Sequence, residues 1–464
     1  MLKAFLMNYL RLLWSLPLVA VLAACGGSGS TAPAPTHFQM TAQDSQLYMT
    51  WDALPGVEYR VFCDPNQQTI NSHTTGSSTP SGRIYFYGIR SGSFYAAGLD
   101  TRGWATGIAN GTPYACTVNG RIDNGPGGPD AIPQRATPRF AGAAWAAGTT
   151  TPLSGMSVQS VAYGYPTGLG LTADKFVAVG SGGKVAVSSA VGSDAVLTWG
   201  SPAQAADLTS ALNAVIFSAT GNRFIAVGDQ GKVAYSSNTS TWTAVSISGA
   251  SGVSLNGLAN AGGAVIAVGS DAASTPQGYI YASSDSGSTW AAVTGVSTHA
   301  LRSVVYVPAT TPYWIAVGDG GAMLKSLNGS TWTSVSPAGT SVNFKSAAML
   351  PVIEGTTVVS YRVVAVGDDG KAWESTNGDT WSAASVSAPT ALVAVYAAKG
   401  QFMALDAAGK AYTSNATVGN WAWSAGVSTV PASPVSVLRY SPSFTAVSNG
   451  WMVFDATGQQ GIAR

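Results

Sequence analysis

The stretch SSDSGSTW, residues 283–290, places an Asp, a Gly and a Trp at fixed offsets between two strand-like runs. Asp285 can accept hydrogen bonds from the amides of a turn, and Gly287 permits a positive φ there. Trp290 is large enough to cover such a turn from its packed side. The stretch therefore predicts a tight hairpin between two strands, beginning at Ser283.

The same kind of unit recurs along residues 139–464. One phrase, typified by FIAVGDQGKVAYSS, occurs in seven copies that start at residues 176, 224, 265, 314, 363, 402 and 444. A strand-like run precedes each copy, and a Trp follows six of them: Trp199, Trp242, Trp290, Trp332, Trp381 and Trp421. A period of roughly 46 residues is typical of propeller blades, and the region lacks the helical periodicity of a helix-pair solenoid.

The strand needed to complete the last unit lies at the front of this region. RFAGAAWAAG, with Trp145, precedes the first copy, whereas the seventh copy reaches the C-terminus without a Trp. We therefore expect an all-β ring of seven four-stranded blades. Its last blade would take three strands from the C-terminus and its outer strand from residues 140–147. Such closure removes the exposed sheet edges of the terminal blades.

The opening motif carries a family resemblance. SSDSGSTW matches S-x-D-x-G-x-T-W and so resembles the Asp-box of the BNR propeller superfamily, which includes sialidases, sortilin-like receptors and the photosystem II assembly factor. SLNGSTW and STNGDTW are one residue shorter, with Asn328 and Asn377 in the role of the Asp, and SSNTSTW lacks the Gly. The resemblance implies that the motif is structural and lies away from the binding face. Four residues are therefore expected to stabilise a turn and not to catalyse a reaction: Ser283, Asp285, Gly287 and Trp290.

Charged residues are scarce and balanced. They make up 9% of the 464 residues and leave a net charge of +1, whereas about a quarter of an average protein is charged. No basic face suggests a nucleic-acid partner, so nucleic-acid binding is not expected. His37, His73 and His299 are isolated in the sequence, and we expect neither a metal site nor a cofactor.

Residues 1–25 have the pattern of an export signal. A positively charged end is followed by the apolar run LLWSLPLVAVLAA, and LAAC ends at Cys25. That ending resembles the lipobox of bacterial lipoproteins, which implies cleavage before Cys25 and a diacylglycerol on its thiol. An ordinary secretory signal with a chance Cys is the alternative. By the same resemblance, Gly26 implies anchoring to the outer membrane through the lipid alone. The sequence does not distinguish the periplasmic face of that membrane from the cell surface. Residues 26–36 then form a flexible tether.

Residues 37–138 are predicted to form a separate β domain. The runs QLYMTW and VEYRVFC alternate like strands, with the turn residues DALPG between them. Together with GTPYACTVNG they resemble a fibronectin type III domain, in which Trp51 is the core Trp and Tyr114 belongs to a late central strand. That resemblance places Cys63 and Cys116 on neighbouring strands, and an exported chain favours paired cysteines, so we expect a disulfide. We interpret the domain as a spacer or docking module.

Two columns of side chains are candidates for a binding face at the mouth of the propeller channel. The second residue of each inner strand is polar in six of seven strands: Gln159, Asn213, Asn256, Arg302, Lys345 and Ser436, with Val393 as the exception. The glycine turns add five acids: Asp229, Asp319, Asp368, Asp369 and Asp406. Arg302 and Lys345 would stand on neighbouring blades, which suits a carboxylate, a phosphate or a cluster of sugar hydroxyls. A hydrated channel lining and ordinary turn capping are the alternative interpretations.

No catalytic set is evident in the sequence. A sialidase needs an Arg triad, a Tyr nucleophile paired with Glu and an acidic proton donor, but Arg223 and Arg362 occupy repeat-equivalent places that would not converge. Glu374 lies on a third strand, where we expect an exposed charge. We therefore expect a monomeric, non-catalytic envelope lipoprotein whose propeller binds an envelope protein or a glycan as a scaffold or assembly module. A glycoside hydrolase or lyase of the Asp-box propeller type, or a surface adhesion protein, is the alternative.

Overall fold

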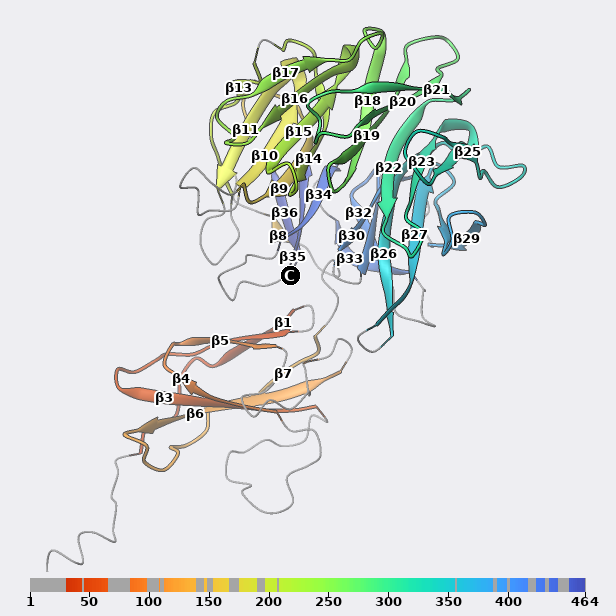
Figure 1. Ribbon diagram of the computed structural model, residues 1–464. Helices are drawn as coiled ribbons and strands as arrows, with labels where there is room; N and C mark the ends of the chain where they lie inside the picture. The colour runs from red at the N-terminus through yellow and green to blue at the C-terminus, as the bar shows by residue number, and fades with distance from the viewer. Residues whose placement is uncertain are drawn as a thin grey trace, which may run out of the picture. The chain divides into compact units, whose positions relative to one another are not determined.

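The computed structural model describes most of the chain after residue 30 (Figure 1). The described residues are 31–43, 46–65, 84–97, 108, 112–138, 146–147, 153–166, 175–189, 197–206, 208–354, 357–386, 390–398, 401–415, 423–429, 434–440 and 450–463. The chain divides into two compact units, with the division between Arg139 and Phe140. In the ranges given above, no helix has both the length and the apolar character needed to cross a bilayer.

The first unit contains two antiparallel sheets, with the strand orders β1-β2-β5 and β4-β3-β6-β7. The strands are β1 (Gln39–Gln43), β2 (Gln46–Thr50), β3 (Val57–Asp64), β4 (Ile84–Ile89), β5 (Ser93–Ala97), β6 (Tyr114–Ile122) and β7 (Gln134–Ala136). Buried and half-buried residues alternate along most of β3. This period of two arises because one face of the strand packs against the other sheet.

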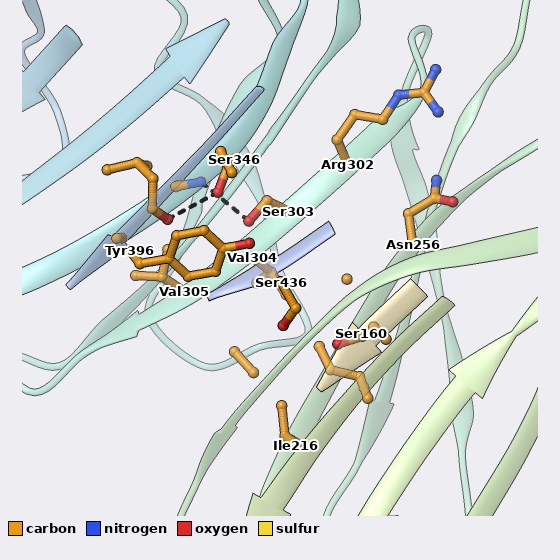
Figure 2. Close-up of a pocket in the computed structure, with 18 of the residues that line it drawn as sticks. Ser160, Ile216, Asn256, Arg302, Ser303, Val304, Val305, Ser346, Tyr396 and Ser436 are labelled. Atoms are coloured by element: carbon orange, nitrogen blue, oxygen red, sulfur yellow. Dashed lines mark hydrogen bonds between the residues drawn. The ribbon is translucent and has the colours of Figure 1, made fainter. Parts of the chain in front are cut away.

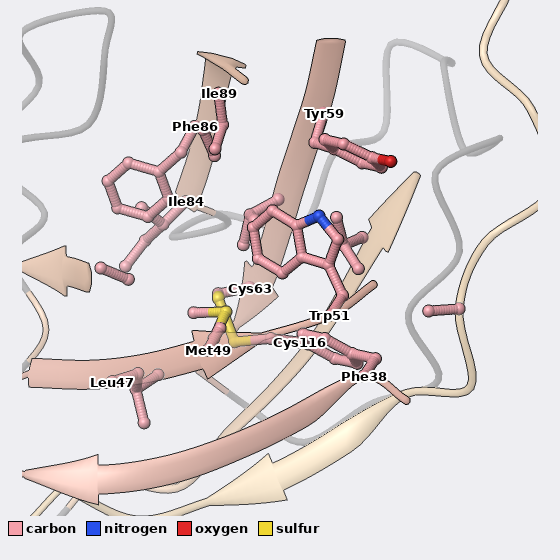
Figure 3. Close-up of a cluster of buried hydrophobic side chains, with 14 of the residues drawn as sticks. Phe38, Leu47, Met49, Trp51, Tyr59, Cys63, Ile84, Phe86, Ile89 and Cys116 are labelled. Carbon is pink, nitrogen blue, oxygen red and sulfur yellow. A yellow bond between two sulfur atoms is a disulfide. The ribbon is translucent and has the colours of Figure 1, made fainter. Parts of the chain in front are cut away.

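One hydrophobic core fills the space between these two sheets (Figure 3). Leu47 and Met49 from β2 belong to it together with Phe86 from β4. Trp51 is buried, and the centre of its ring lies 5.4 Å from that of Tyr59. Trp51 is therefore a core residue, as the sequence predicts.

Cys63 and Cys116 form the predicted disulfide. They lie on β3 and β6, which are antiparallel neighbours, and the two residues stand directly opposite each other in the register. Both are fully buried within the core of the first unit (Figure 3). The bond therefore links the two central strands of the four-stranded sheet.

The second unit consists of antiparallel sheets that follow one another along the chain. Its described residues form seven such sheets, and each inner strand pairs with a middle strand. The first four sheets contain β9 (Val158–Gly164), β10 (Lys175–Gly180), β11 (Lys184–Ser189), β12 (Thr198–Trp199) and β13 (Ala203–Gln204); β14 (Leu212–Ser218), β15 (Arg223–Gly228), β16 (Lys232–Ser236) and β17 (Thr243–Ser246); β18 (Val253–Ala261), β19 (Ala264–Asp271), β20 (Gly278–Ser283) and β21 (Ala291–Ser297); and β22 (Leu301–Val307), β23 (Tyr313–Gly318), β24 (Met323–Ser326) and β25 (Thr333–Ser334).

The remaining sheets complete the unit. They contain β26 (Phe344–Glu354), β27 (Thr357–Gly367), β28 (Lys371–Ser375) and β29 (Ser382–Ser385); β30 (Leu392–Ala398), β31 (Gln401–Asp406), β32 (Lys410–Asn415) and β33 (Ser424–Thr429); and β34 (Pro434–Tyr440), β35 (Gly450–Asp455), β36 (Gln460–Ala463) and β8 (Ala146–Ala147). Three short 3-10 turns, η1 (Ser181–Gly183), η2 (Asp229–Gly231) and η3 (Asp319–Gly321), follow second strands. The pairing of β8 with β36 joins the front of the unit to its last sheet. Trp145 lies outside the described residues.

The inner strands bring the sheets together around a common centre. Each contacts the inner strand of the next sheet, and β34 contacts β9. The apolar runs of the second strands are buried on both faces: every residue of β23 is buried, as is all of β15 after Arg223. Continuous apolar runs such as FIAVG suit this position because a neighbouring sheet covers each face. This is the architecture of a β-propeller, and the predicted all-β propeller is confirmed.

The structure corrects the prediction for Glu374. Its side chain is 7% exposed, not at the surface, and it forms an ion pair of 2.5 Å with Arg362, which is fully buried. Arg362 also donates to the hydroxyl of Ser414 on the next sheet, and the Trp423 indole N–H donates to Glu374 at 3.0 Å. The sequence pattern missed this pair because Arg362 meets Glu374 only through the pairing of β27 with β28, and because Trp423 reaches Glu374 from a segment 49 residues away.

Candidate functional site

A cavity of about 660 Å³ lies where the inner strands meet. Residues from β9, β14, β18, β22, β26, β30 and β34 line it, so every sheet of the second unit contributes to the wall (Figure 2). Its volume falls within the range of about 300–1,000 Å³ that is typical of ligand pockets. The wall combines amide, hydroxyl, aliphatic and aromatic side chains with two cations.

A β-bulge on each inner strand orients the first row of this wall. In all seven sheets the register between the inner strand and its neighbour skips one residue, which is the second residue of six inner strands and the fourth of β18. The extra residue of a bulge is unpaired and its side chain is redirected. The residues at this position all line the cavity: Gln159, Asn213, Asn256, Arg302, Lys345, Val393 and Val435.

The register corrects one member of the predicted column. Ser436 pairs with Phe454, and the shift lies between Pro434 and Ser436, so Val435 is the bulged residue of β34. Ser436 belongs to the third position of the inner strands. The sequence alignment was off by one residue here because β34 begins with Pro434, one residue earlier than expected.

Small residues at that third position connect neighbouring sheets. Val215 donates its amide to the hydroxyl of Ser160 at 3.3 Å, and Ala347 donates to Ser303 at 3.2 Å. Ser436 receives the amide of Val161 at 3.0 Å and donates back to the carbonyl of the same residue. These bonds satisfy inner-strand backbone groups that would otherwise be unpaired beside the cavity.

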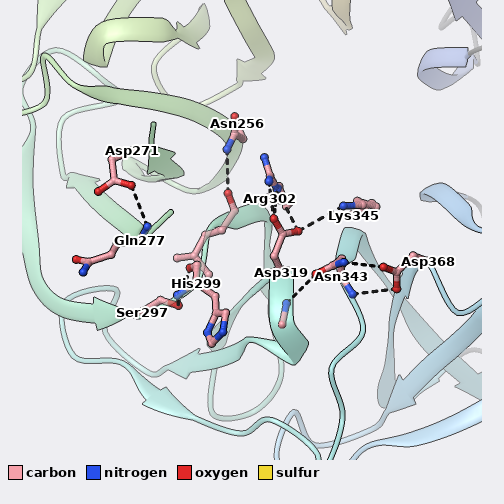
Figure 4. Close-up of polar contacts among 12 residues, drawn as sticks. Asn256, Asp271, Gln277, Ser297, His299, Arg302, Asp319, Asn343, Lys345 and Asp368 are labelled. Atoms are coloured by element: carbon pink, nitrogen blue, oxygen red, sulfur yellow. Dashed lines mark hydrogen bonds and ion pairs between the residues drawn. The ribbon is translucent and has the colours of Figure 1, made fainter. Parts of the chain in front are cut away.

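Arg302 and Lys345 share one carboxylate, that of Asp319 (Figure 4). The Arg302 guanidinium lies 2.5 Å from Asp319, and the Lys345 ammonium lies 3.4 Å from it. Burial alone would raise the pKa of Asp319, but the hydrogen bonds and charges of both cations outweigh this effect and lower it. The predicted cation pair is therefore present on neighbouring sheets, yet it is partly neutralised by the turn acid of the same sheet as Arg302.

The asparagines of the column also make bonds within the protein. Asn213 donates to Asp229 at 2.9 Å and to the Leu255 carbonyl on the next sheet at 3.2 Å. Asn256 donates to the Leu301 carbonyl at 3.0 Å, again on the next sheet. Both asparagines therefore position neighbouring sheets as well as line the cavity.

The remaining turn acids cap the backbone. Asp368 accepts both the amide and the side-chain N–H of Asn343 (Figure 4). Asp369 accepts the amide of Lys371 and the indole N–H of Trp373. Asp406 is buried and accepts amides of its own turn. Such contacts are ordinary turn chemistry, and none of these three acids lines the cavity.

The Asp-box turn joins β20 to β21, at the opposite end of its sheet from the bulge. Asp285 accepts the amide of Thr289 at 2.8 Å and its hydroxyl at 2.6 Å. Ser283 accepts the amide of Gly287, whose φ is +85°, and the Trp290 indole donates to the Gly287 carbonyl at 3.0 Å. The predicted turn is therefore present, and its polar groups bond to one another.

Three sister turns reproduce this geometry with Asn in place of Asp. Asn238, Asn328 and Asn377 each accept the amide of the Thr three residues later, at 2.8, 2.8 and 3.0 Å. Where the Gly is missing, Thr239 takes the positive φ of +64°. The turns also contact the preceding sheet: Arg223 donates to Ser288 of the Asp-box at 2.8 Å.

The substitution Asp285→Asn is expected to remove a pH dependence without removing the turn. Burial alone would raise the pKa of Asp285, but bonds from Thr289 and Ser283 outweigh it and lower the pKa to about 2. Because the folded pKa lies below the ordinary value, this stabilisation is present above about pH 4 and is lost as the pH falls toward 2.

Urea unfolding at about pH 7 and about pH 3 measures this effect. We expect wild type to lose more stability at the lower pH than Asp285→Asn, because Asn fills the same place in the sister turns. Asp285→Ala should be less stable than both at neutral pH, since it lacks the acceptor. Equal acid sensitivity in wild type and Asp285→Asn would contradict the role of the charge.

Sequence comparison leaves the family of the chain open: no known family model matches it, and no curated protein matches it. Solved structures match the fold. The virginiamycin B lyase from Staphylococcus aureus has a TM-score of 0.50 and 9% identity, over 68% of this chain and 97% of that one. YCF48 bound to D1 peptide has a TM-score of 0.49 and 17% identity, over 69% of this chain and 94% of that one. The WD40 propeller domain of Doa1 has a TM-score of 0.49 and 11% identity, over 69% of this chain and 97% of that one. At these identities the likeness shows the propeller fold alone.

The sequence analysis expects no metal site and a lipid on Cys25. Among the residues that the structure describes, no group of three or more His, Cys, Asp or Glu side chains could hold a metal ion. Cys25, the expected lipidation site, lies outside the described residues.

Sequence reasoning found the column but missed what surrounds it. The bulges and the sharing of Asp319 by two cations were not predicted. Nor was the serine row, which is the set of serines that follow a bulged residue: Ser160, Ser303, Ser346 and Ser436. One signal was available: Ser, Ala or Gly follows the column residue in each inner strand, as at Ser160, Ala214, Gly257, Ser303, Ser346, Ala394 and Ser436.

Proposed function

We propose that the protein is a non-catalytic, monomeric envelope lipoprotein whose propeller binds a protein or glycan partner as a scaffold or assembly module. The observation that supports this proposal is the cavity at the common centre. All the inner strands contribute to its wall, and bulges direct a largely polar row of side chains into it. A concave site with a few oriented polar groups is the usual form of a ligand pocket.

The second unit, in this proposal, is one closed propeller of seven blades over residues 139–464. The contact between β34 and β9 and the pairing of β8 with β36 support closure. A closed ring leaves only short, protected strand edges and holds the seven wall segments in fixed positions. Such rigidity favours binding, because little order has to be gained when a partner enters.

The first unit, residues 37–138, is proposed to be a fibronectin type III-like spacer. A three-stranded and a four-stranded sheet around one core, with β3 beside β6, support this assignment. The lipobox-like LAAC sequence supports residues 1–25 as a signal, Cys25 as the outer-membrane anchor and residues 26–36 as a tether. The anchor would then hold the propeller near the membrane without a spanning segment.

The double substitution Arg302→Ala/Lys345→Ala is expected to weaken capture of the partner while the protein stays folded. Both side chains line the cavity and are partly exposed, so their removal creates no void in the core. The test is a crosslinked pull-down of the full-length lipoprotein from its own envelope. Lys371→Ala is a matched control, because Lys371 is an exposed cation outside the cavity.

A partner that is recovered with wild type and Lys371→Ala but lost with the double variant would support the proposed function. Full recovery with a well-folded double variant would remove the cation side of the cavity as the binding face. Turnover of a polysaccharide by the purified protein would favour the hydrolase or lyase alternative. Loss of cell attachment in a deletion strain without any discrete partner would favour adhesion.

A further inference from the structure

The charge at the cavity mouth is smaller than the sequence suggests. Two cations, Arg302 and Lys345, share the single carboxylate of Asp319, so the formal charge of the three groups together is +1. Asp319 takes up the Nε and one terminal nitrogen of Arg302. One of the donor pairs with which Arg can hold a carboxylate or phosphate is therefore already engaged inside the protein.

The other polar side chains at the mouth are the neutral amides of β9, β14 and β18, and β18 lies next to the strand that carries Arg302. Asn213 uses both of its N–H groups within the protein, which leaves its amide oxygen as an acceptor toward the cavity. Asn256 uses one N–H and retains another together with its oxygen. Gln159 is exposed, and in the described structure no hydrogen bond of its side chain is found.

The serine row below adds donors. The hydroxyls of Ser160 and Ser303 each accept one backbone amide, and the proton of each hydroxyl remains available. Both residues line the cavity, and Figure 2 shows Ser160 and Ser303 on different sides of the open centre. The wall of the cavity therefore offers both donors and acceptors.

The deeper wall is apolar. Ile216, Val305 and Tyr396 line it beneath the polar rows, and Figure 2 shows the Tyr396 ring at the open centre. An aromatic ring beside aliphatic groups offers a surface for the C–H faces of a ligand that is polar only at its edges.

We propose that this cavity binds a neutral carbohydrate, such as the end of an oligosaccharide chain. A sugar hydroxyl donates and accepts at once, so it matches a ring of amide oxygens, amide N–H groups and serine hydroxyls. An ionised carboxylate only accepts, so it cannot donate to the amide oxygens of Asn213 and Asn256 as a sugar hydroxyl can. This inference rests on the proposed binding function and specifies the ligand class of the same cavity.

The experiment is a titration of the full chain with two sets of probes. The neutral set contains hexasaccharides of glucose, mannose and N-acetylglucosamine, and the acidic set contains hexagalacturonate and a free hexapeptide with a carboxylate end. Isothermal titration calorimetry at low and high salt measures each affinity. A neutral ligand should bind equally at both, because screening acts only on charge.

Three variants refine the test. Gln159→Ala should weaken neutral-sugar binding about tenfold, the effect of losing one good hydrogen-bonding group. Lys345→Gln removes charge but keeps donors, so it should change neutral-sugar affinity by less than about threefold. Val393→Trp fills the mouth from a position without a polar role and should abolish binding of any ligand.

Binding of a neutral hexasaccharide with these responses supports the inference. Binding only of acidic probes, lost in Lys345→Gln and at high salt, overturns the carbohydrate inference and leaves the proposed binding function intact. If no sugar binds but a protein is captured by wild type and lost with Val393→Trp, the carbohydrate inference is likewise overturned and the proposed binding function stays intact. If no neutral probe binds at millimolar concentration, the inference fails; if Val393→Trp also leaves envelope capture unchanged, the proposed function fails with it.

Discussion

The substitution Arg362→Met is expected to lower the free energy of unfolding of the second unit by about 3–5 kcal/mol, the usual cost of breaking a buried ion pair. Glu374 would keep its charge at 7% exposure with no cation beside it. The stacking of the guanidinium on Phe402, whose ring centre is 5.1 Å away, would be lost as well. Chemical unfolding of the full chain at neutral pH measures the loss.

A second substitution tests the mechanism of this loss. Arg362→Met/Glu374→Gln removes both charges and keeps an oxygen for the Trp423 indole, so most of the stability should return. Asp379→Asn, which breaks the exposed ion pair with Lys325, should cost less than about 1 kcal/mol. If Arg362→Met unfolds like wild type, or the double variant is no better than the single one, the buried charge is not what destabilises the variant.

Removal of the disulfide has the second largest expected effect. Cys63 and Cys116 are 53 residues apart, and closing a loop of that length stabilises a domain by about 4 kcal/mol in the chain-entropy model. The variant Cys63→Ala/Cys116→Ala should therefore unfold its first unit at a clearly lower temperature. The transition of the second unit should not change, because the bond lies wholly within the first unit.

Scanning calorimetry of the full chain, with and without reductant, separates these transitions. The first unit of reduced wild type should unfold at the same temperature as that of the double Ala variant. Reductant should not change the unfolding temperature of that variant. A first-unit transition that stays in place after both cysteines are removed would show that the core around Trp51 is sufficient without the bond.

Features encoded by local sequence were predictable. The turn at Asp285 follows from residues within five positions of one another, and the repeat of the FIAVG strands fixes the sheet order. The position of Cys63 opposite Cys116 followed from a resemblance that specifies neighbouring strands. For the turn and the sheet order, the residues that determine the feature are close in sequence or repeat at a fixed period.

Features that depend on side-chain contacts between different strands were not predictable from one strand at a time. Glu374 is buried because Arg362 and Trp423 surround it. The charge at the mouth is reduced because Asp319 reaches both Arg302 and Lys345. Alternating burial along a strand reports which face is covered, but it does not report which side chain of the neighbouring sheet covers it.

In the proposed function, the cavity at the meeting point of the inner strands is the binding site. The most direct test is crosslinked capture from the native envelope with the mouth blocked by Val393→Trp, beside wild type and Lys371→Ala. Val393 lines the cavity on β30 and has no polar role there. We predict that wild type and Lys371→Ala retain the same partner or glycan and that Val393→Trp, folded to the same thermal stability, loses it. Equal capture by all three proteins would contradict the claim and place the binding surface elsewhere on the chain.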